Sequence, residues 1–187
     1  MKSAVFLYNT QSGKCKIERC TEAVCTVFRA YGYEITPQPI DFEANPFDGN
    51  EQIDLMVVAG GDGTVNEIAN GIAGFPNAAM TCIPIGTGND FLKNFGKDAE
   101  PLFLDAENLW NGDVTPLDLI DCNGKYCLTI ACTGIDARIA ESVHEFGASP
   151  MLSGRGSYLA SVAVNFLFRK IGRRWRVTLD DEGIEDT

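Results

Sequence analysis

Histidine is nearly absent from this sequence, and the one residue, His144, has no cysteine beside it. There is no Cys-x-x-Cys pair either, so a zinc site is not expected. The seven cysteines recur mainly at intervals of five, a spacing that leaves one face of a helix and switches faces on a strand. An odd number also argues against complete disulfide pairing. We therefore expect reduced, mostly buried thiols, as in a cytoplasmic protein.

Positive charge and long apolar runs are also scarce. The 15 lysines and arginines face 26 acidic residues, and the net charge of −11 argues against a nucleic acid partner. No apolar run reaches the ~20 residues of a membrane-spanning helix, and the N-terminus lacks the layout of a signal peptide. The length of 187 residues suits one domain or slightly more, and 45% hydrophobic residues can form a core.

The most informative stretch is Ile53 to Asn70, which reads IDLMVVAGGDGTVNEIAN. An apolar run ends in the loop Gly60 to Thr64, and apolar residues then follow at spacings of three and four. This order predicts a strand, a loop and a helix. Closely spaced glycines leave backbone N–H groups accessible, and a helix N-terminus adds unpaired donors and a positive dipole end. The loop is therefore predicted to bind an anion, most plausibly a phosphate chain.

The same loop also has a purely structural interpretation. Asp62 could cap the helix, and Thr64 with Glu67 fits a capping box. Two observations favour phosphate binding. An acid within a phosphate loop makes sense beside a metal ion or a donor hydroxyl. A second glycine loop, 86–90, follows the next predicted strand, Met80 to Ile85, so that the two loops can line one crevice.

The remaining pattern up to residue 114 predicts a Rossmann-like three-layer α/β domain. Strands are expected at 4–8 and 34–40, and helices at 17–31 and 101–110. Asn89 or Asp90 could cap a short helix after the second glycine loop. Ligands bind at the carboxyl ends of strands in such sheets. Asn9 and Ser12 come just after the first strand, so they are expected either to contact a nucleotide or to form an ordinary turn.

After Gly112 the pattern changes. Runs at 114–122 and 125–133 flank Asn123-Gly124, the strongest short hairpin signal. We place a domain boundary near Thr115, with residues 1–114 as the nucleotide-binding domain and 115–187 as the beginning of an antiparallel, β-rich second domain. Helices are expected at 138–146 and 157–170, and a strand at 175–180. These strands are expected to need partners beyond Thr187, so that unpaired edges would favour association with further copies.

Several of these segments together resemble the diacylglycerol kinase catalytic domain family, shared by bacterial lipid kinases, diacylglycerol kinases, sphingosine kinases and ceramide kinases. The resemblance rests on NTQSG at 9–13, GGDGTVNE at 60–67, PIGTGNDF at 84–91, LDL at 117–119 and GIDA at 134–137, in that order. Thr10 stands where the family usually has proline. The GGDGT element alone is less specific, because NAD kinases and phosphofructokinases carry similar loops.

The resemblance implies transfer of the γ-phosphoryl group of ATP to a lipid hydroxyl, with a diacylglycerol-like acceptor and Mg²⁺. Asp62 would hold the metal or orient the acceptor, while the other metal ligands stay unassigned. Catalysis is expected in the cytoplasm or at the inner membrane face. The implied nucleotide contacts are Asn9, Ser12, Thr36, Gly60, Gly61, Asp62, Gly63, Thr64, Val65, Asn66, Gly86 and Thr87.

One expected family segment is missing. The family places an Asp-Gly-Glu segment late in its second domain, where it is thought to supply the base. Here the nearest text is Asp181-Glu182-Gly183, in a different order. The main base is therefore expected beyond Thr187, and these residues alone are expected to bind nucleotide without catalysing transfer.

Two other functions stay open at this stage. One is a kinase for a non-lipid acceptor such as NAD, against which the GTGNDF loop argues. The other is a non-catalytic nucleotide-binding regulatory module. Five basic residues within 169–176 could contact anionic lipid head groups, but a solvated face that balances the acids at 180–186 is the favoured interpretation.

Overall fold

The computed structural model describes residues 2–10, 17–41, 52–75, 77–147, 159, 161–165, 175–179 and 182–186. The chain divides into two compact units, Met1–Ile130 and Ala131–Thr187. None of the described helices is long and apolar enough to cross a membrane.

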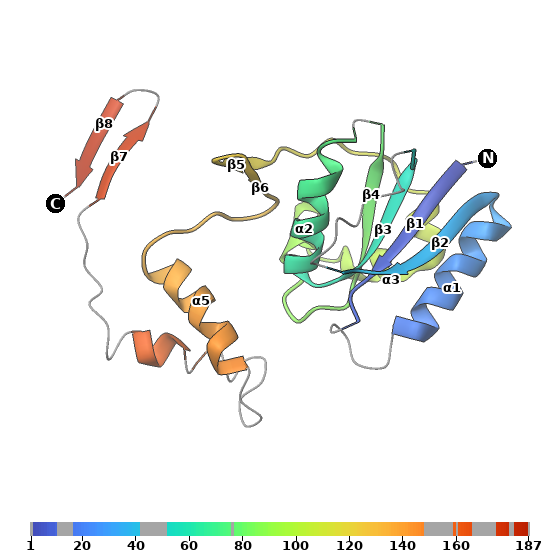
Figure 1. The fold of residues 1–187 in the computed structure, drawn as a ribbon, viewed down its shortest axis with the longest axis horizontal. Coiled ribbons are helices and arrows are strands. Elements are labelled where there is room, and N and C mark those ends of the chain that lie inside the picture. The colour runs from blue at the N-terminus through green and yellow to red at the C-terminus, as the bar shows by residue number, and fades with distance from the viewer. Residues whose placement is uncertain are drawn as a thin grey trace. The chain divides into compact units, whose positions relative to one another are not determined.

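Unit 1 is built on a parallel sheet in the order β2-β1-β3-β4. Its strands are β1 (Lys2–Tyr8), β2 (Tyr33–Pro39), β3 (Leu55–Gly60) and β4 (Ala79–Pro84). Helices α1 (Ile17–Ala30) and α2 (Asp62–Ile72) lie on opposite faces of the sheet (Figure 1). The predicted three-layer α/β architecture is confirmed. The two prolines of β2 are compatible with a strand because β2 lies at the edge of the sheet, where missing N–H donors cost little.

Two apolar cores, one on each face, hold the layers together. Along β1, Val5 and Leu7 join the core beneath α2, while Ala4 and Phe6 join the core beneath α1. The side-chain period of two along a strand produces this division, because both faces of a parallel sheet are covered by helices. Ile68 of α2 is fully buried in the first core. The end of β3 is thereby fixed against the start of α2.

The predicted helix at 101–110 is wrong in one respect, because the structure has two short helices there. These are α3 (Glu100–Leu104) and α4 (Ala106–Trp110). Asp105 between them is extended, with φ −92° and ψ 113°, and its carboxylate accepts a hydrogen bond from the backbone N–H of Glu107. An aspartate in that position begins a new helix instead of continuing the old one. The preceding loop forms a 3₁₀ helix, η1 (Asp90–Phe95).

The predicted hairpin is present, with shorter strands than expected. Strands β5 (Ile120–Cys122) and β6 (Lys125–Cys127) pair in antiparallel register around Asn123-Gly124. Both turn residues have positive φ, 57° and 82°, as a tight primed turn requires. Residues 114–119 are not a strand. The hairpin belongs to the compact unit that ends at Ile130, whereas the domain boundary near Thr115 stays a prediction.

Unit 2 contains α5 (Ile135–Gly147), helical residues at 159 and 161–165, and the hairpin of β7 (Trp175–Leu179) with β8 (Glu182–Asp186). The expectation that strand 175–180 pairs only beyond Thr187 is wrong, because β8 is its partner. Buried Ser142 and Ser161 hydroxyls hydrogen-bond each other, and Asn165 donates to Ser142 at 2.8 Å. This polar cluster joins α5 to residues 161–165.

The six cysteines that the structure describes are free thiols, as expected, but they are not mostly buried. Cys25 and Cys82 are buried in unit 1, whereas Cys122 and Cys132 are exposed. Cys122 is the last residue of β5, in a hairpin too short to bury both of its faces, and Cys132 follows the end of unit 1. Burial therefore follows the sheet and not the regular spacing of the cysteines.

Candidate functional site

The two glycine loops meet at the carboxyl edge of the sheet. Gly60, the last residue of β3, lies opposite Pro84, the last residue of β4. A Cβ atom built on Gly86 would lie 2.5 Å from the Cα of Gly61, and one built on Gly61 would lie 3.2 Å from the Cα of Gly86. No larger residue fits at Gly86 without a shift of backbone, so glycine is required there by the contact between the loops.

Helix α2 begins directly at the first loop. Gly61 is its N-cap residue, and no side chain among the described residues caps it. The interpretations in which Asp62 caps the helix, or Thr64 and Glu67 form a capping box, are therefore wrong. Thr64 is the third residue of the helix and has 6% of its surface exposed, and Glu67 is exposed. The first-turn N–H groups stay available to a ligand, together with the positive end of the helix dipole.

Asp62 joins the two loops instead. Its Oδ1 accepts a hydrogen bond of 3.1 Å from the backbone N–H of Phe91, at the start of η1. Phe91 is buried, so this bond satisfies a donor that water cannot easily reach. Asp62 Oδ2 lies 2.9 Å from the position that a Cβ on Gly88 would take, which places the carboxylate directly against the second loop.

Two asparagines fix the shapes of the loops. Asn9, just after β1, donates from Nδ2 to Thr64 Oγ1 at 3.0 Å and so ties β1 to the first turn of α2. Asn89 has φ 53°, a left-handed conformation that asparagine tolerates, and its Oδ1 accepts from Gly86 N at 3.1 Å. Its Nδ2 also donates to Gly86 O at 3.3 Å, so Asn89 closes the turn that presents Thr87. Asn89 stands at the N-cap position of η1 but makes no side-chain cap bond.

Gly63 marks the open side of the first loop. It is exposed, and a Cβ built on it meets no atom within 4 Å. Thr87 on the second loop is also exposed. By contrast, a Cβ on Gly60 would lie 2.5 Å from the Cβ of Thr64. Protein contacts thus require glycine at Gly60 and Gly61 of the first loop, whereas Gly63 borders space that a ligand could occupy.

The remaining predicted contacts lie elsewhere. Thr36 lies within the edge strand β2, three residues before its end, which is about 10 Å short of the carboxyl edge. The Val65 side chain is buried in the core. The Asn66 amide is bonded to the hairpin, with Oδ1 accepting from Leu128 N at 2.9 Å. Ser12 lies outside the described residues. The structure thus brings together Asn9, 60–64, Gly86 and Thr87, while sequence reasoning did not identify Asn89 as a residue that shapes the site.

Two ionisable groups beside the loops, Cys82 and Lys93, have raised pKa values. Burial, with a smaller effect of the Asp62 carboxylate, raises the pKa of Cys82 to about 12, so this thiol is protonated at neutral pH. The Lys93 ammonium pairs with Asp90, whose hydrogen bond and charge raise the lysine pKa. Among the described residues, no group of three or more histidines, cysteines or acids could hold a metal by itself. The site therefore offers backbone donors, hydroxyls and single carboxylates.

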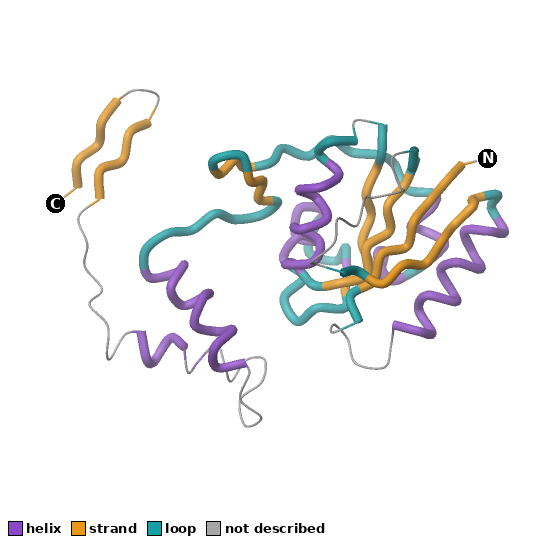
Figure 2. Tube along the Cα trace, viewed as in Figure 1, coloured by secondary structure: helices purple, strands orange, loops and turns teal. Residues whose placement is uncertain are grey.

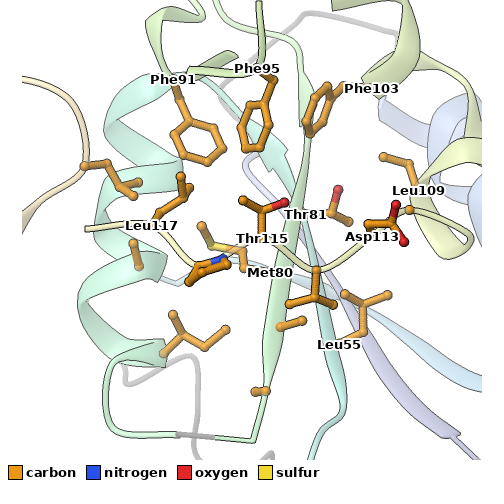
Figure 3. A pocket seen from close by; sticks show the side chains of 18 of the residues that line it. Leu55, Met80, Thr81, Phe91, Phe95, Phe103, Leu109, Asp113, Thr115 and Leu117 are labelled. Atoms are coloured by element: carbon orange, nitrogen blue, oxygen red, sulfur yellow. The ribbon is translucent and has the colours of Figure 1, made fainter. Parts of the chain in front are cut away.

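A separate cavity of about 720 Å³ lies beside β4 (Figure 3). Its walls include Met80 and Thr81 from the first half of β4, and the rings of Phe91, Phe95 and Phe103. Neighbouring rings of these three lie 5.5 and 5.1 Å apart between centroids. Residues 112–117 also line it, including part of the segment from 114 that was predicted to be a strand. The cavity contains the Asp113 carboxylate and is largely apolar, so it is not suited to a phosphate chain.

Comparisons with known proteins identify relatives of this chain. Residues 3–122 match the family described as "Diacylglycerol kinase catalytic domain". The diacylglycerol kinase of Bacillus subtilis (strain 168) is 33% identical over 140 residues, which cover 72% of this chain and 46% of that protein. The one from Staphylococcus epidermidis (strain ATCC 12228 / FDA PCI 1200) is 32% identical over 140 residues, covering 71% and 44%. The chain thus spans less than half the length of these curated relatives.

A solved structure supports the fold. The crystal structure of a diacylglycerol kinase from Bacillus anthracis str. Sterne has a TM-score of 0.63 and 22% identity, covering 99% of this chain and 61% of that one. At this identity the likeness shows the fold alone. The family match covers both glycine loops and the hairpin strand β5, whereas the GIDA segment at 134–137 lies outside the matched residues. The chain belongs to the diacylglycerol kinase catalytic domain family.

Proposed function

We propose that this chain carries the nucleotide-binding part of an ATP-dependent lipid kinase, which transfers the γ-phosphoryl group to the hydroxyl of a diacylglycerol-like lipid. The observation that carries the proposal is the backbone contact between Gly61 and Gly86, which leaves Gly63 open at an uncapped helix N-terminus. Such a helix end binds phosphate through its N–H groups and dipole. Membership of the family supports phosphoryl transfer as the reaction.

The proposed phosphate contacts are the backbone of 60–64 and the hydroxyl of Thr87. Asn9 acts by holding Thr64, and Asn89 acts by holding the turn at Gly86. Because Thr36 lies well short of the loops, we assign it no phosphate contact. Positioning and neutralisation of phosphate charge provide most of the catalysis in such reactions. These loops are suited to positioning.

The loops also fit a magnesium ion that arrives with the nucleotide. Mg²⁺ usually binds through one or two carboxylates together with substrate phosphates. Asp62 would be the protein ligand, because its carboxylate lies between the two loops. When bound, the ion neutralises phosphate charge. The lipid acceptor and the membrane surface at which it resides are part of the same proposal.

Titration of the chain with ATP and Mg²⁺, followed by calorimetry, tests the nucleotide site. Gly63→Val places a branched side chain in the open space, and its Cβ meets no protein atom within 4 Å. Because this side chain would occupy the space of the phosphates, the affinity for ATP should fall at least tenfold. Gly74→Val is the matched control, because Gly74 lies beyond the far end of α2 and its Cβ would make only an ordinary contact of 3.5 Å. Equal ATP affinity in the two variants would refute the assignment.

The acceptor is tested with the full-length gene product and labelled ATP. Diacylglycerol should be phosphorylated, and NAD should not. Transfer to NAD alone would identify a kinase of a non-lipid acceptor. Nucleotide binding without transfer to any acceptor would identify a regulatory module.

A further inference from the structure

The outer edge of the hairpin carries backbone groups that none of the other described strands pairs with. Tyr126 lies opposite Asp121, one residue from the pair Cys122 and Lys125 that flanks the turn. In an antiparallel pair, alternate residues direct their N–H and C=O groups towards the partner strand and away from it. The N–H and C=O of Tyr126, and the N–H of Leu128 two residues later, therefore face away from β5. An isolated two-stranded hairpin of this length is not stable by itself.

Two asparagines of α2 take the place of a third strand. Tyr126 N donates to Asn70 Oδ1 at 2.7 Å, and Asn70 Nδ2 donates to Tyr126 O at 2.7 Å. One turn earlier on the helix, Asn66 Oδ1 accepts from Leu128 N at 2.9 Å. The two amides are four residues apart, so both lie on the same face of α2. Figure 2 shows the hairpin beside this helix.

The helix that holds the hairpin is also the helix that forms the phosphate loop. Asp62 is its first residue, and Asn66 and Asn70 follow one and two turns later. Asn70 Nδ2 additionally donates to Asn66 O at 2.9 Å, which orients the second amide on the helix. The chain leaves unit 1 after Ile130, two residues beyond the bonded Leu128. Helix α2, with its 11 residues, thus links the first glycine loop to the segment at which the chain leaves unit 1.

We propose that Asn66 and Asn70 are positioning residues, whose amides fix the β5–β6 hairpin on α2 and couple its docking to nucleotide binding at the start of the same helix. The hydrogen bonds of Asn66 and Asn70 are sufficient evidence for docking of the hairpin on α2, whereas the coupling to nucleotide binding rests on the proposed function. Coupling is reciprocal: a nucleotide that holds the first turn of α2 stabilises the docked hairpin, and loss of docking weakens nucleotide binding by the same factor. Asn66 therefore supports the site from behind and does not contact the nucleotide.

Amide hydrogen exchange tests docking without nucleotide. In Asn70→Ala the Tyr126 amide should exchange at least about tenfold faster, and in Asn66→Ala the same should hold for Leu128, because each loses its acceptor. Alanine is a better helix former than asparagine, so α2 itself should not be weakened. The buried β3 amide of Val57 is the internal reference, and Asn77→Ala, an exposed asparagine beyond α2, is the matched control. Unchanged exchange at Tyr126 and Leu128 in both variants would overturn docking.

Repeating the exchange with saturating ATP and Mg²⁺ tests the coupling. The Tyr126 and Leu128 amides of the unmodified chain should be protected at least about twofold further, and Asn70→Ala should bind ATP more weakly by up to that factor, which is reached when docking is lost completely. Bound ATP with no change at these amides would refute the coupling but leave docking intact. Failure of the unmodified chain to bind ATP would refute the proposed function, and the coupling with it, while docking is decided by the first measurement.

Discussion

The contact between the two glycine loops predicts a large and local effect of a single methyl group. In Gly86→Ala the new Cβ would lie 2.5 Å from the Cα of Gly61 and 2.9 Å from Asn89 Oδ1. Carbon atoms in contact are normally separated by about 3.5–4.0 Å, so the loops must separate by about 1 Å or more. Because the first obstacle is backbone, no rotamer change can relieve it.

Overpacking of this kind costs about 1–3 kcal/mol. For a chain of 150–250 residues, each kcal/mol lowers the melting temperature by about 2–4 °C. Gly86→Ala should therefore melt about 2–12 °C below the unmodified chain, as measured by circular dichroism without nucleotide. Separation of the loops should also abolish the Phe91 N–H bond to Asp62, so the Phe91 amide should lose exchange protection.

Gly63→Ala is the matched control for this prediction. Its Cβ meets no atom within 4 Å, and alanine is favoured over glycine in a helix by up to about 1 kcal/mol. The two glycine-to-alanine variants should thus change the melting temperature in opposite directions. If Gly86→Ala melts within 1 °C of the unmodified chain, the loops do not touch, and the shared crevice is wrong.

Two further predictions concern Asp62 and Cys82. Asp62→Asn keeps an acceptor for Phe91 N, so the free energy of unfolding should change by less than about 1 kcal/mol. Under the proposed function, phosphoryl transfer by the full-length gene product should fall by orders of magnitude in this variant. A large melting shift with preserved transfer would make Asp62 a structural residue only. Burial raises the pKa of the Cys82 thiol to about 12, whereas an unfolded cysteine has a pKa of about 8.5. The contribution of this thiol to the free energy of unfolding is therefore fully present below pH 8.5 and should be lost as the pH rises towards 12. Urea unfolding at pH 8 and pH 11 measures the loss, and an equal loss in Cys82→Ala would assign it to another group. At pH 8 iodoacetamide should modify exposed Cys122 and leave Cys82 unmodified in the folded chain.

Local patterns were sufficient for much of the fold. The continuous apolar run of β1, the helical spacing of α1 and the left-handed turn at Asn123-Gly124 depend on residues close together in the chain. Backbone conformation and side-chain period determine such features, so sequence alone predicts them. The strand, glycine loop and helix around Asp62 were predictable for the same reason. Local patterns were less informative at 101–110, where the apolar periodicity continues across Asp105 although the helix ends there and a new one begins.

The arrangement of the site depends on contacts between distant residues. Asp62 bonds to an amide 29 positions away, and Asn66 and Asn70 bond to amides 62 and 56 positions away. The sequence predicted glycine loops, but only the parallel pairing of β3 and β4 brings Gly61 against Gly86. It also grouped Thr36 and Asn66 with the phosphate loop, whereas the sheet order and the hairpin place their side chains elsewhere. Residue types suggested the chemistry of the two loops, and tertiary packing decided which side chains could face a ligand, because a side chain already bonded within the protein is not available to one.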